Sequence, residues 1–273
     1  MIGIHLMGGL GNQLFQIVSA IAYSIEQNDI FVFTKNLQVN YGVTQRYTYW
    51  NNFFILLKPY LMNELPELNE VNEGDFRYKI LPVKKDTKIS GYFQSYKYFQ
   101  KYEEDIFYIL GINLLKDNLL KKLNKKKEDF ENKVSMHFRL GDYKHLTDFH
   151  NIMDIKYYID SIKHIQTSLS NTLTIYYFCE DEDIDMVNKK INIIKTIYTH
   201  EFIRISGLED WEQLIFMSLC NHNIIANSSF SWWGAYLNEW NNKIVCRPSK
   251  WFNDSSIDTS DLCPSTWKTI QIT

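Results

Sequence analysis

The chain lacks cysteine pairs, long apolar runs and a strong net charge. Its four cysteines (Cys179, Cys220, Cys246 and Cys263) are far apart and form no CxxC motif, which predicts reduced, mostly buried thiols in a cytosolic protein. No stretch approaches the ~18 consecutive apolar residues of a membrane span. The first residues have no basic region or cleavage site, so we expect no signal peptide. These absences predict a cytoplasmic protein without a transmembrane span, and they leave peripheral membrane association open.

Charge excludes one class of partner and marks one residue type as scarce. A net charge of −3 and a pI of about 6.2 give no global reason to expect nucleic acid. Only five of the 29 basic residues are arginines, at positions 46, 77, 139, 204 and 247. An arginine in this chain is therefore a rarer choice than a lysine.

What is present describes an ordinary folded protein. The 273 residues are 45% hydrophobic and 22% charged, which excludes disorder, collagen and coiled coil and allows one or two domains. An apolar run at 2–7, a glycine break at 8–11, helical spacing from 14 to 26 and a second apolar run at 30–33 predict a βαβ unit. Residues 35–110 show no clear order of elements. The charged segment 116–133 predicts an exposed helix that leads to a domain boundary.

From Val134 onward, strands and helices are expected to alternate. The expected strands are 134–138, 173–178, 193–198, 223–226 and 243–246, and the expected helices are 155–169, 183–190, 210–220 and 230–239. Such alternation predicts a parallel, doubly wound α/β sheet. We therefore predict an N-terminal domain at 1–130 and a second domain at 131–273.

Polar or glycine-rich segments follow four of the expected strands. They are Gly8–Gln13, Arg139–Tyr143, Cys179–Asp181 and Asn227–Ser229. In an open α/β sheet, ligands bind beyond the carboxyl ends of the strands. Any one segment could be turn chemistry, but four together indicate one site.

The glycine loop and Arg139 both suit a phosphate. The loop is neither a dinucleotide fingerprint, because Leu14 stands where a third glycine is needed, nor a Walker loop, because it lacks Gly-Lys-Ser/Thr. A phosphate cradle and a plain strand-to-helix turn remain as alternatives. The guanidinium of Arg139 matches a pyrophosphate bidentately. The side chains of His137 and Arg139 are two residues apart and point to the same face of an extended chain. Taken alone, His137 would be interpreted as a half-buried structural histidine.

Two acidic or histidine-rich segments raise the question of a metal. Asp181, Asp183 and Asp185 form two Asp-x-Asp triplets, but acids are also common in the first turn of a helix, and we favour that origin for Asp183 and Asp185. Glu180 and Asp181 could instead accept hydrogen bonds from a ribose or a base. His145, Asp148 and His150 could form a metal cluster, but loop histidines at such spacing are usually incidental.

Several longer motifs carry a resemblance to a known family. GGLGNQLFQ (8–16), GYFQSYKYF (91–99), HFRLGDY (137–143), SLCNHNIIANSSFSWWGAYL (218–237) and RPSKW (247–251) together resemble the α-1,2-fucosyltransferases of glycosyltransferase family 11. They occur in the order of the family and span nearly the whole chain. One departure is Leu140, where the family often carries a second arginine.

The resemblance implies an α/β, GT-B-like fold with two Rossmann-like lobes and a donor site in the cleft between them. The N-terminal lobe would face the acceptor and the C-terminal lobe would bind GDP-fucose. It further implies fucosyl transfer with inversion to the 2-hydroxyl of a terminal galactose in a glycan, without a metal or other cofactor.

Carried onto this sequence, the resemblance gives Arg139 a catalytic role at the GDP phosphates. Together with the reading of the strand ends, it gives a donor-binding set of Gly9, Leu10, Gly11, Asn12, His137, Glu180, Asp181, Asn227, Ser228, Ser229 and Phe230. Asp142 is the expected catalytic base, although it could instead anchor Arg139 or cap a turn. Tyr92 and Trp232 could line the acceptor cleft, but core positions suit them better.

Two rival functions remain at this point. The donor could be another GDP-deoxyhexose, or the linkage could differ, since small pocket changes decide such preferences. A nucleotide- or glycan-binding module without turnover is the other alternative. It would have no need of the combined phosphate-binding groups at His137, Arg139, Asp142 and 227–229.

Overall fold

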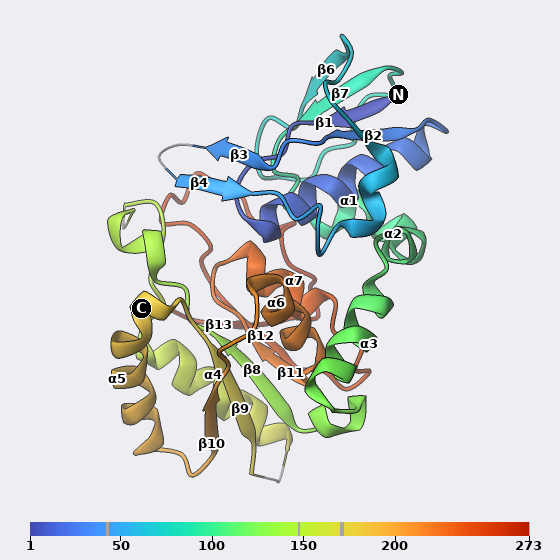
Figure 1. Ribbon diagram of the computed structural model, residues 1–273. Coiled ribbons are helices and arrows are strands. Elements are labelled where there is room, and N and C mark those ends of the chain that lie inside the picture. The colour runs from blue at the N-terminus through green and yellow to red at the C-terminus, as the bar shows by residue number, and fades with distance from the viewer. Residues whose placement is uncertain (42–43, 147, 170–171, 273) are drawn as a thin grey trace. The chain divides into compact units, whose positions relative to one another are not determined.

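The computed structural model describes residues 1–41, 44–146, 148–169 and 172–272, and it divides the chain into two compact units (Figure 1). Unit 1 comprises Met1–Leu115 and Ile257–Pro264, and unit 2 comprises Lys116–Ser256 and Ser265–Thr273. The division falls within helix α3 (Ile112–Leu123) rather than at residue 130, and a short C-terminal segment returns to unit 1.

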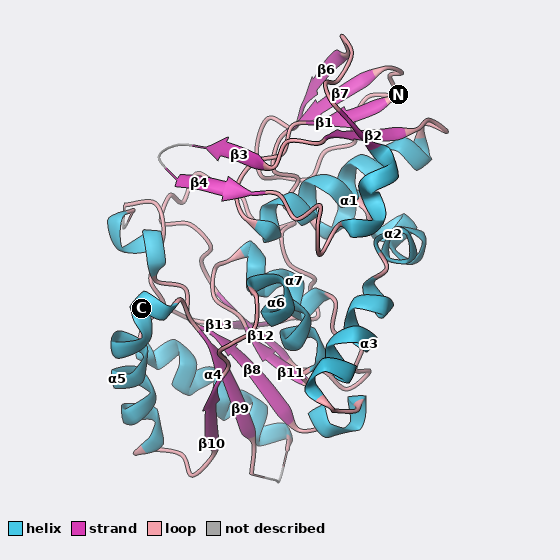
Figure 2. Ribbon diagram, viewed as in Figure 1, coloured by secondary structure: helices cyan, strands magenta, loops and turns pink. Residues whose placement is uncertain are grey.

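Unit 1 is built on a five-stranded, wholly parallel sheet (Figure 2). Its strands are β1 (Ile2–Ile4), β2 (Phe31–Thr34), β5 (Leu61–Met62), β6 (Asn69–Asn72) and β7 (Thr87–Ser90), in the order β5-β2-β1-β7-β6. Helix α1 (Leu10–Glu26) connects β1 to β2, which confirms the predicted βαβ unit. The unit also contains helix α2 (Glu103–Leu110) and a hairpin of β3 (Gln38–Tyr41) and β4 (Thr44–Tyr47).

Unit 2 is a six-stranded parallel sheet with helices on both faces. The strands are β8 (Lys133–His137), β9 (Thr174–Phe178), β10 (Glu201–Arg204), β11 (His222–Ile224), β12 (Val245–Pro248) and β13 (Lys268–Ile270), in the order β10-β9-β8-β11-β12-β13. The helices are α4 (Ile155–Ser168), α5 (Ile184–Lys195), α6 (Asp210–Leu219) and α7 (Ser229–Tyr236). Two parallel α/β units confirm the predicted fold class.

Strand β9 shows how the sequence covers both faces of this sheet. Successive side chains of a strand point to opposite faces. Ile175 and Tyr177 lie in the hydrophobic core that α4 and α5 complete. The rings of Tyr176 and Phe178 pack against Phe216 of α6, at centroid distances of 5.1 and 5.8 Å. Burial on both faces is the reason why residues 175–178 of this strand are all apolar or aromatic.

One expected strand is wrong. Residues 193–198 were expected to form a strand, but α5 continues to Lys195 and the strand next to β9 is β10, at Glu201–Arg204. Val187, Ile191 and Ile194 are buried at helical spacing, whereas Ile193 is 52% exposed. A short apolar run does not distinguish a helix end from a strand, and here the buried face belongs to the helix. Strand β13 was not predicted at all.

Candidate functional site

The topology of unit 2 marks one edge of its sheet. The chain leaves β8 for β9 and β10 on one side, then returns to β11 on the other side of β8. Ligands of open parallel sheets bind where the strand order reverses, outside the carboxyl ends of the two strands at that point. The segments that follow β8 and β11 are those with the HFRLGDY and NSSF motifs. Two segments singled out in the sequence therefore flank the switch point.

Arg139, just beyond β8, is held by three side chains. Its two terminal nitrogens donate to Asp142 and to Glu180, and its guanidinium lies 5.0 Å from the centroid of the Tyr143 ring. Burial lowers the pKa of Arg139, but the charges of Asp142, Tyr143 and Glu180 outweigh it and raise that pKa above its ordinary value. Arg139 therefore stays charged, with its planar fork fixed at the switch point.

The observed pairing bears on Asp142 and Glu180. Both were predicted to lie in the site, and both contact Arg139. Their side chains keep 36% and 43% of their surface exposed, so water can solvate them if a phosphate takes their place on the guanidinium. The sequence left open whether Asp142 is a base or an anchor for Arg139. The observed ion pair with Arg139 is the contact that an anchor would make. Its role as a base stays a prediction.

Asp183 has a role that the sequence did not indicate. Asp183 is the N-cap residue of α5, but its fully buried side chain makes no capping hydrogen bond. It belongs to no cluster of metal ligands among the described residues. Its two oxygens accept hydrogen bonds from the backbone N–H of Gly141, at 2.7 Å, and from the ammonium of Lys144, at 2.6 Å. Asp183 does lie at the start of a helix, as expected, but the sequence did not indicate that its side chain clamps the loop that follows Arg139.

The other residues of the two possible metal-binding segments have different surroundings. Asp181 is exposed and pairs with Arg204, and Asp185 is exposed. The ring of His150 stacks on Tyr143 at 3.9 Å, and burial lowers its pKa to about 4, while Asp148 is exposed. The side chain of His145, the third member of the suggested cluster, lies outside the residues described.

His137 and Asn227 bring unsatisfied polar atoms to the switch point. His137 is 8% exposed and Asn227 is fully buried. Within the described residues, His137 Nδ1 and Asn227 Oδ1 have no hydrogen-bond partner, although Asn227 Nδ2 donates to the carbonyl of Trp251 at 3.0 Å. Buried polar atoms without partners are rare in native proteins and call for an explanation such as a ligand.

Two further contacts define the chemistry of this edge. Burial, aided by the charge of Arg139, lowers the pKa of His137 to about 3, so its imidazole is neutral at physiological pH. The hydroxyl of Tyr143 donates to the carbonyl of Asn227 at 2.9 Å and so joins the two loops. The charged guanidinium attracts an anion such as a phosphate, and the neutral imidazole and the amide can hydrogen-bond a polar ligand beside it.

Helix α7 begins at Ser229, two residues after Asn227. Ser228 is its N-cap residue, and its side chain makes no capping hydrogen bond. Ser228 is buried, and Ser229 and Phe230 are half-buried, with the Phe230 ring 5.7 Å from that of His137. The amino end of a helix attracts anions because backbone N–H groups and the helix dipole point outward there. All three predicted residues therefore lie beside His137 or at this end.

The glycine loop of unit 1 opens helix α1. Gly8 has φ of +74°, and a Cβ atom there would stand 2.4 Å from the Asn12 side chain, so glycine is required. Gly9 is the N-cap, and a Cβ there would meet nothing within 4 Å. The Leu10 side chain is buried in the core, which leaves its backbone for any ligand. Whether Gly9, Leu10, Gly11 and Asn12 meet the donor stays a prediction.

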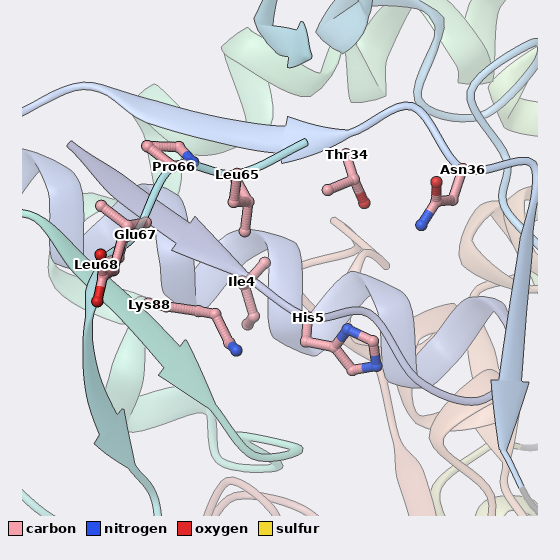
Figure 3. Close-up of a pocket in the computed structure, with 9 residues that line it drawn as sticks. All are labelled: Ile4, His5, Thr34, Asn36, Leu65, Pro66, Glu67, Leu68 and Lys88. Atoms are coloured by element: carbon pink, nitrogen blue, oxygen red, sulfur yellow. The ribbon is translucent and has the colours of Figure 1, made fainter. Parts of the chain in front are cut away.

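A separate pocket lies in unit 1, with a volume of about 340 Å³ (Figure 3). It is lined by His5, Thr34 and Asn36 near the carboxyl ends of β1 and β2, by residues 65–68, and by Ile4 and Lys88. It contains none of the predicted site residues. In the described part of the chain, no helix is both long and apolar enough to cross a membrane.

Comparisons with known proteins identify the family. Residues 1–271 match the model of glycosyl transferase family 11. The chain is 29% identical over 292 residues to an alpha-1,2-colitosyltransferase of Escherichia coli, with 98% of each chain covered. It is 30% identical over 191 residues to the O-antigen biosynthesis glycosyltransferase WbnK of Escherichia coli, with 66% of this chain and 61% of that protein covered.

Solved structures give weaker similarities. The structure of Arabidopsis thaliana FUT1 mutant R284K with GDP has a TM-score of 0.46 and 10% identity, covering 98% of this chain and 75% of that one. The NodZ alpha-1,6-fucosyltransferase has a TM-score of 0.47 and 10% identity, covering 86% and 92%. The assignment rests on the match to the family model. The matched residues, 1–271, span both units and include every motif that carried the resemblance. The chain belongs to glycosyltransferase family 11.

Proposed function

We propose that this family 11 glycosyltransferase transfers L-fucose from GDP-fucose to the 2-hydroxyl of a terminal galactose in a glycan, with inversion at the anomeric carbon. The observation that carries the proposal is the switch point of unit 2. There a fixed guanidinium lies with two unpartnered buried atoms, His137 Nδ1 and Asn227 Oδ1. A GDP-sugar supplies both the phosphate anion and the polar atoms that such an edge lacks.

The proposed reaction needs two contributions from the chain. The galactose hydroxyl attacks the anomeric carbon, the bond from that carbon to the phosphate oxygen breaks, and GDP leaves with the electron pair. Arg139 and the amino end of α7 stabilise the negative charge that develops on the β-phosphate. A carboxylate accepts the proton of the hydroxyl, and Asp142 is the proposed base.

The direct test of the reaction is an incubation with GDP-fucose and lactose. We expect free GDP and a fucosylated trisaccharide in equal amounts, with an α-1,2 linkage by NMR. GDP without trisaccharide would indicate hydrolysis and the wrong acceptor. Binding of GDP-fucose without any release of GDP would instead support the non-catalytic binding module.

A second donor deserves a matched assay because of one comparison. The relative aligned over 98% of both chains is named a colitosyltransferase, and colitose is fucose without its 3-hydroxyl. A site that hydrogen-bonds a hydroxyl rejects the analogue that lacks it by about 10⁴–10⁵-fold, whereas a site built for the smaller sugar rejects the hydroxyl only weakly. The ratio of kcat/KM for GDP-fucose and GDP-colitose therefore identifies the donor. A fucose site should prefer GDP-fucose strongly, so similar rates with the two donors, or any preference for GDP-colitose, would overturn the fucose proposal.

Activity is expected to persist in excess EDTA. Arg139 and α7 can neutralise the leaving phosphate, and the acids that follow β9 are already engaged, Asp181 with Arg204 and Asp183 with Lys144. The measurement is the initial rate of GDP release with EDTA, compared with the rate in added magnesium or manganese. A complete loss that either metal restores would contradict the prediction.

Replacing Asp142 by asparagine separates its two roles. If Asp142 is the base, kcat falls by about 10²–10⁴-fold while the Kd for GDP changes little. The amide keeps an oxygen toward Arg139, so the anchoring contact survives in part. Steady-state rates and GDP titrations on the same preparation provide the comparison. A loss under tenfold in kcat would assign Asp142 to holding Arg139 instead.

A further inference from the structure

Unit 1 has a switch point of its own. Its strand order β5-β2-β1-β7-β6 reverses between β1 and β7. The segment after β1 is the glycine loop that leads to Asn12, and the segment after β7 is Gly91–Ser95, part of a motif that the proposed function has not used. By the same rule that located the edge of unit 2, these two segments flank the ligand side of unit 1.

A buried carboxylate organises the segment after β7. Glu73, the residue after β6, is 6% exposed, and its Oε2 accepts hydrogen bonds from the backbone N–H groups of Tyr92 and Phe93, both at 2.8 Å. Phe93 has φ of +52° and Gly91 has φ of +153°. A Cβ atom at Gly91 would lie 2.5 Å from Glu73 Oε2. The carboxylate thus holds a turn whose backbone the chain would not otherwise favour.

The turn is connected to the glycine loop by one side chain. Gln94 follows Phe93 directly, and its Nε2 donates to Asn12 Oδ1 at 2.9 Å. Next to it, Ser95 Oγ donates to the carbonyl of Asp261 at 2.6 Å and fixes the far end of the turn. A chain of contacts therefore runs from Glu73 through the turn to Asn12, a residue of the proposed donor-binding set.

We propose that Glu73 is a positioning residue for glycosyl transfer: its carboxylate holds the Tyr92–Phe93 turn, so that Gln94 orients Asn12 in the glycine loop. The proposal rests on the proposed function, in which that loop meets the GDP-sugar. Glu73 itself need touch neither substrate. A carboxylate bonds backbone N–H groups about twice as strongly as a neutral acid does, so the turn is firmest when Glu73 is ionised.

The surroundings of Glu73 make its ionisation sensitive to physiological pH. Burial raises the pKa of Glu73 to about 7. The hydrogen bonds from the Phe93 and Tyr92 N–H groups act in the opposite direction and lower this pKa. Asp75 nearby raises this pKa further and the hydroxyl of Tyr98 lowers it, while Lys79 is engaged by Asp75 at 2.7 Å. Glu73 is therefore neutral below about pH 7 and charged above it, so activity that depends on the firm turn falls as the pH drops through 7.

The test is Glu73→Gln, assayed for GDP release and transfer between pH 5.5 and 9. Glutamine keeps one oxygen for the two N–H groups but cannot ionise. We expect kcat about tenfold below the wild-type value at pH 8, since small misplacements of binding groups cost rate. We also expect the variant to lose the limb of the pH–rate profile near pH 7, that is, the fall in rate below that pH. The control is Glu70→Gln on β6, whose carboxylate is largely exposed and pairs with Lys88, and it should keep both the rate and the limb.

A folded Glu73→Gln variant with wild-type kcat and an unchanged limb near pH 7 would overturn the proposal. If the variant does not fold, amide hydrogen exchange on the wild-type protein takes its place. After correction for the intrinsic effect of pH, protection of the Tyr92 and Phe93 amides should weaken below pH 7, and constant protection would refute the role of Glu73. This measurement needs no substrate, so its result is independent of any failure of the proposed function.

Discussion

Replacing Arg139 by lysine is expected to lower kcat/KM for GDP-fucose by about 10²–10³-fold. Lysine keeps the charge but loses the planar fork that meets two oxygens at once. One preorganised donor to a developing anion is typically worth about 3–4 kcal/mol. Leu140, which follows Arg139, supplies no second charge to compensate. Steady-state kinetics with varied GDP-fucose measure the loss.

Stability separates this effect from misfolding. The carboxylates released by Arg139→Lys, those of Asp142 and Glu180, are more than a third exposed. Lysine keeps a positive charge beside them, and a pair with so exposed a carboxylate contributes about 1 kcal/mol or less. The free energy of unfolding should therefore fall by no more than about 2 kcal/mol for the two pairs. Arg77→Lys is the matched control, because Arg77 is 66% exposed and lies 3.9 Å from Asp258 in unit 1. A folded Arg139→Lys variant that keeps more than about half of the wild-type activity would disprove the phosphate contact.

Trp232→Ala is expected to lower the free energy of unfolding by about 3–5 kcal/mol, the cost of truncating a large buried aromatic. Trp232 is fully buried in α7. Its ring stacks on Tyr236 at 4.6 Å, meets Trp233 edge-on at 5.0 Å and lies 5.5 Å from Trp267. This packing makes Trp232 a core residue and excludes it from lining an acceptor cleft. Urea unfolding followed by tryptophan fluorescence and circular dichroism measures the change.

The control for that loss is an aromatic residue on the surface. Tyr108 of α2 is 87% exposed, and Tyr108→Ala should change stability by no more than about 0.5 kcal/mol. A Trp232→Ala variant as stable as Tyr108→Ala would contradict the packing described here. Equal stability combined with a raised KM for the acceptor would return Trp232 to the acceptor site.

The sequence predicted unit 2 better than unit 1, and for a physical reason. Unit 2 separates its strands by helices long enough to show their period, such as α4 with 14 residues and α5 with 12, and polar residues follow β8, β9 and β11. Between residues 35 and 110, the strands are two to four residues long. Such a strand shows at most two repeats of the alternating pattern, too few to predict its type from the sequence.

The candidate site shows the same division between local and distant information. Arg139, His137 and Asn227 could be predicted because each lies at the end of a strand or within three residues of it, where chemistry and topology coincide. Asp183 and Glu73 could not be predicted, because their partners lie 42 and about 20 residues away in the chain. An acid at a helix start looks the same in sequence whether it caps the helix or, as Asp183 does, clamps another loop.

Amide hydrogen exchange of the intact protein, with and without saturating GDP, tests the central proposal most directly. The proposal places the GDP phosphates between the loop that follows Arg139 and the start of α7. Amides in segments 139–143 and 227–231 should exchange more slowly with GDP, and those of α5 (Ile184–Lys195) should be unchanged. Saturating GDP that protects neither segment, or protects a different part of unit 2, would contradict a nucleotide site at the switch point.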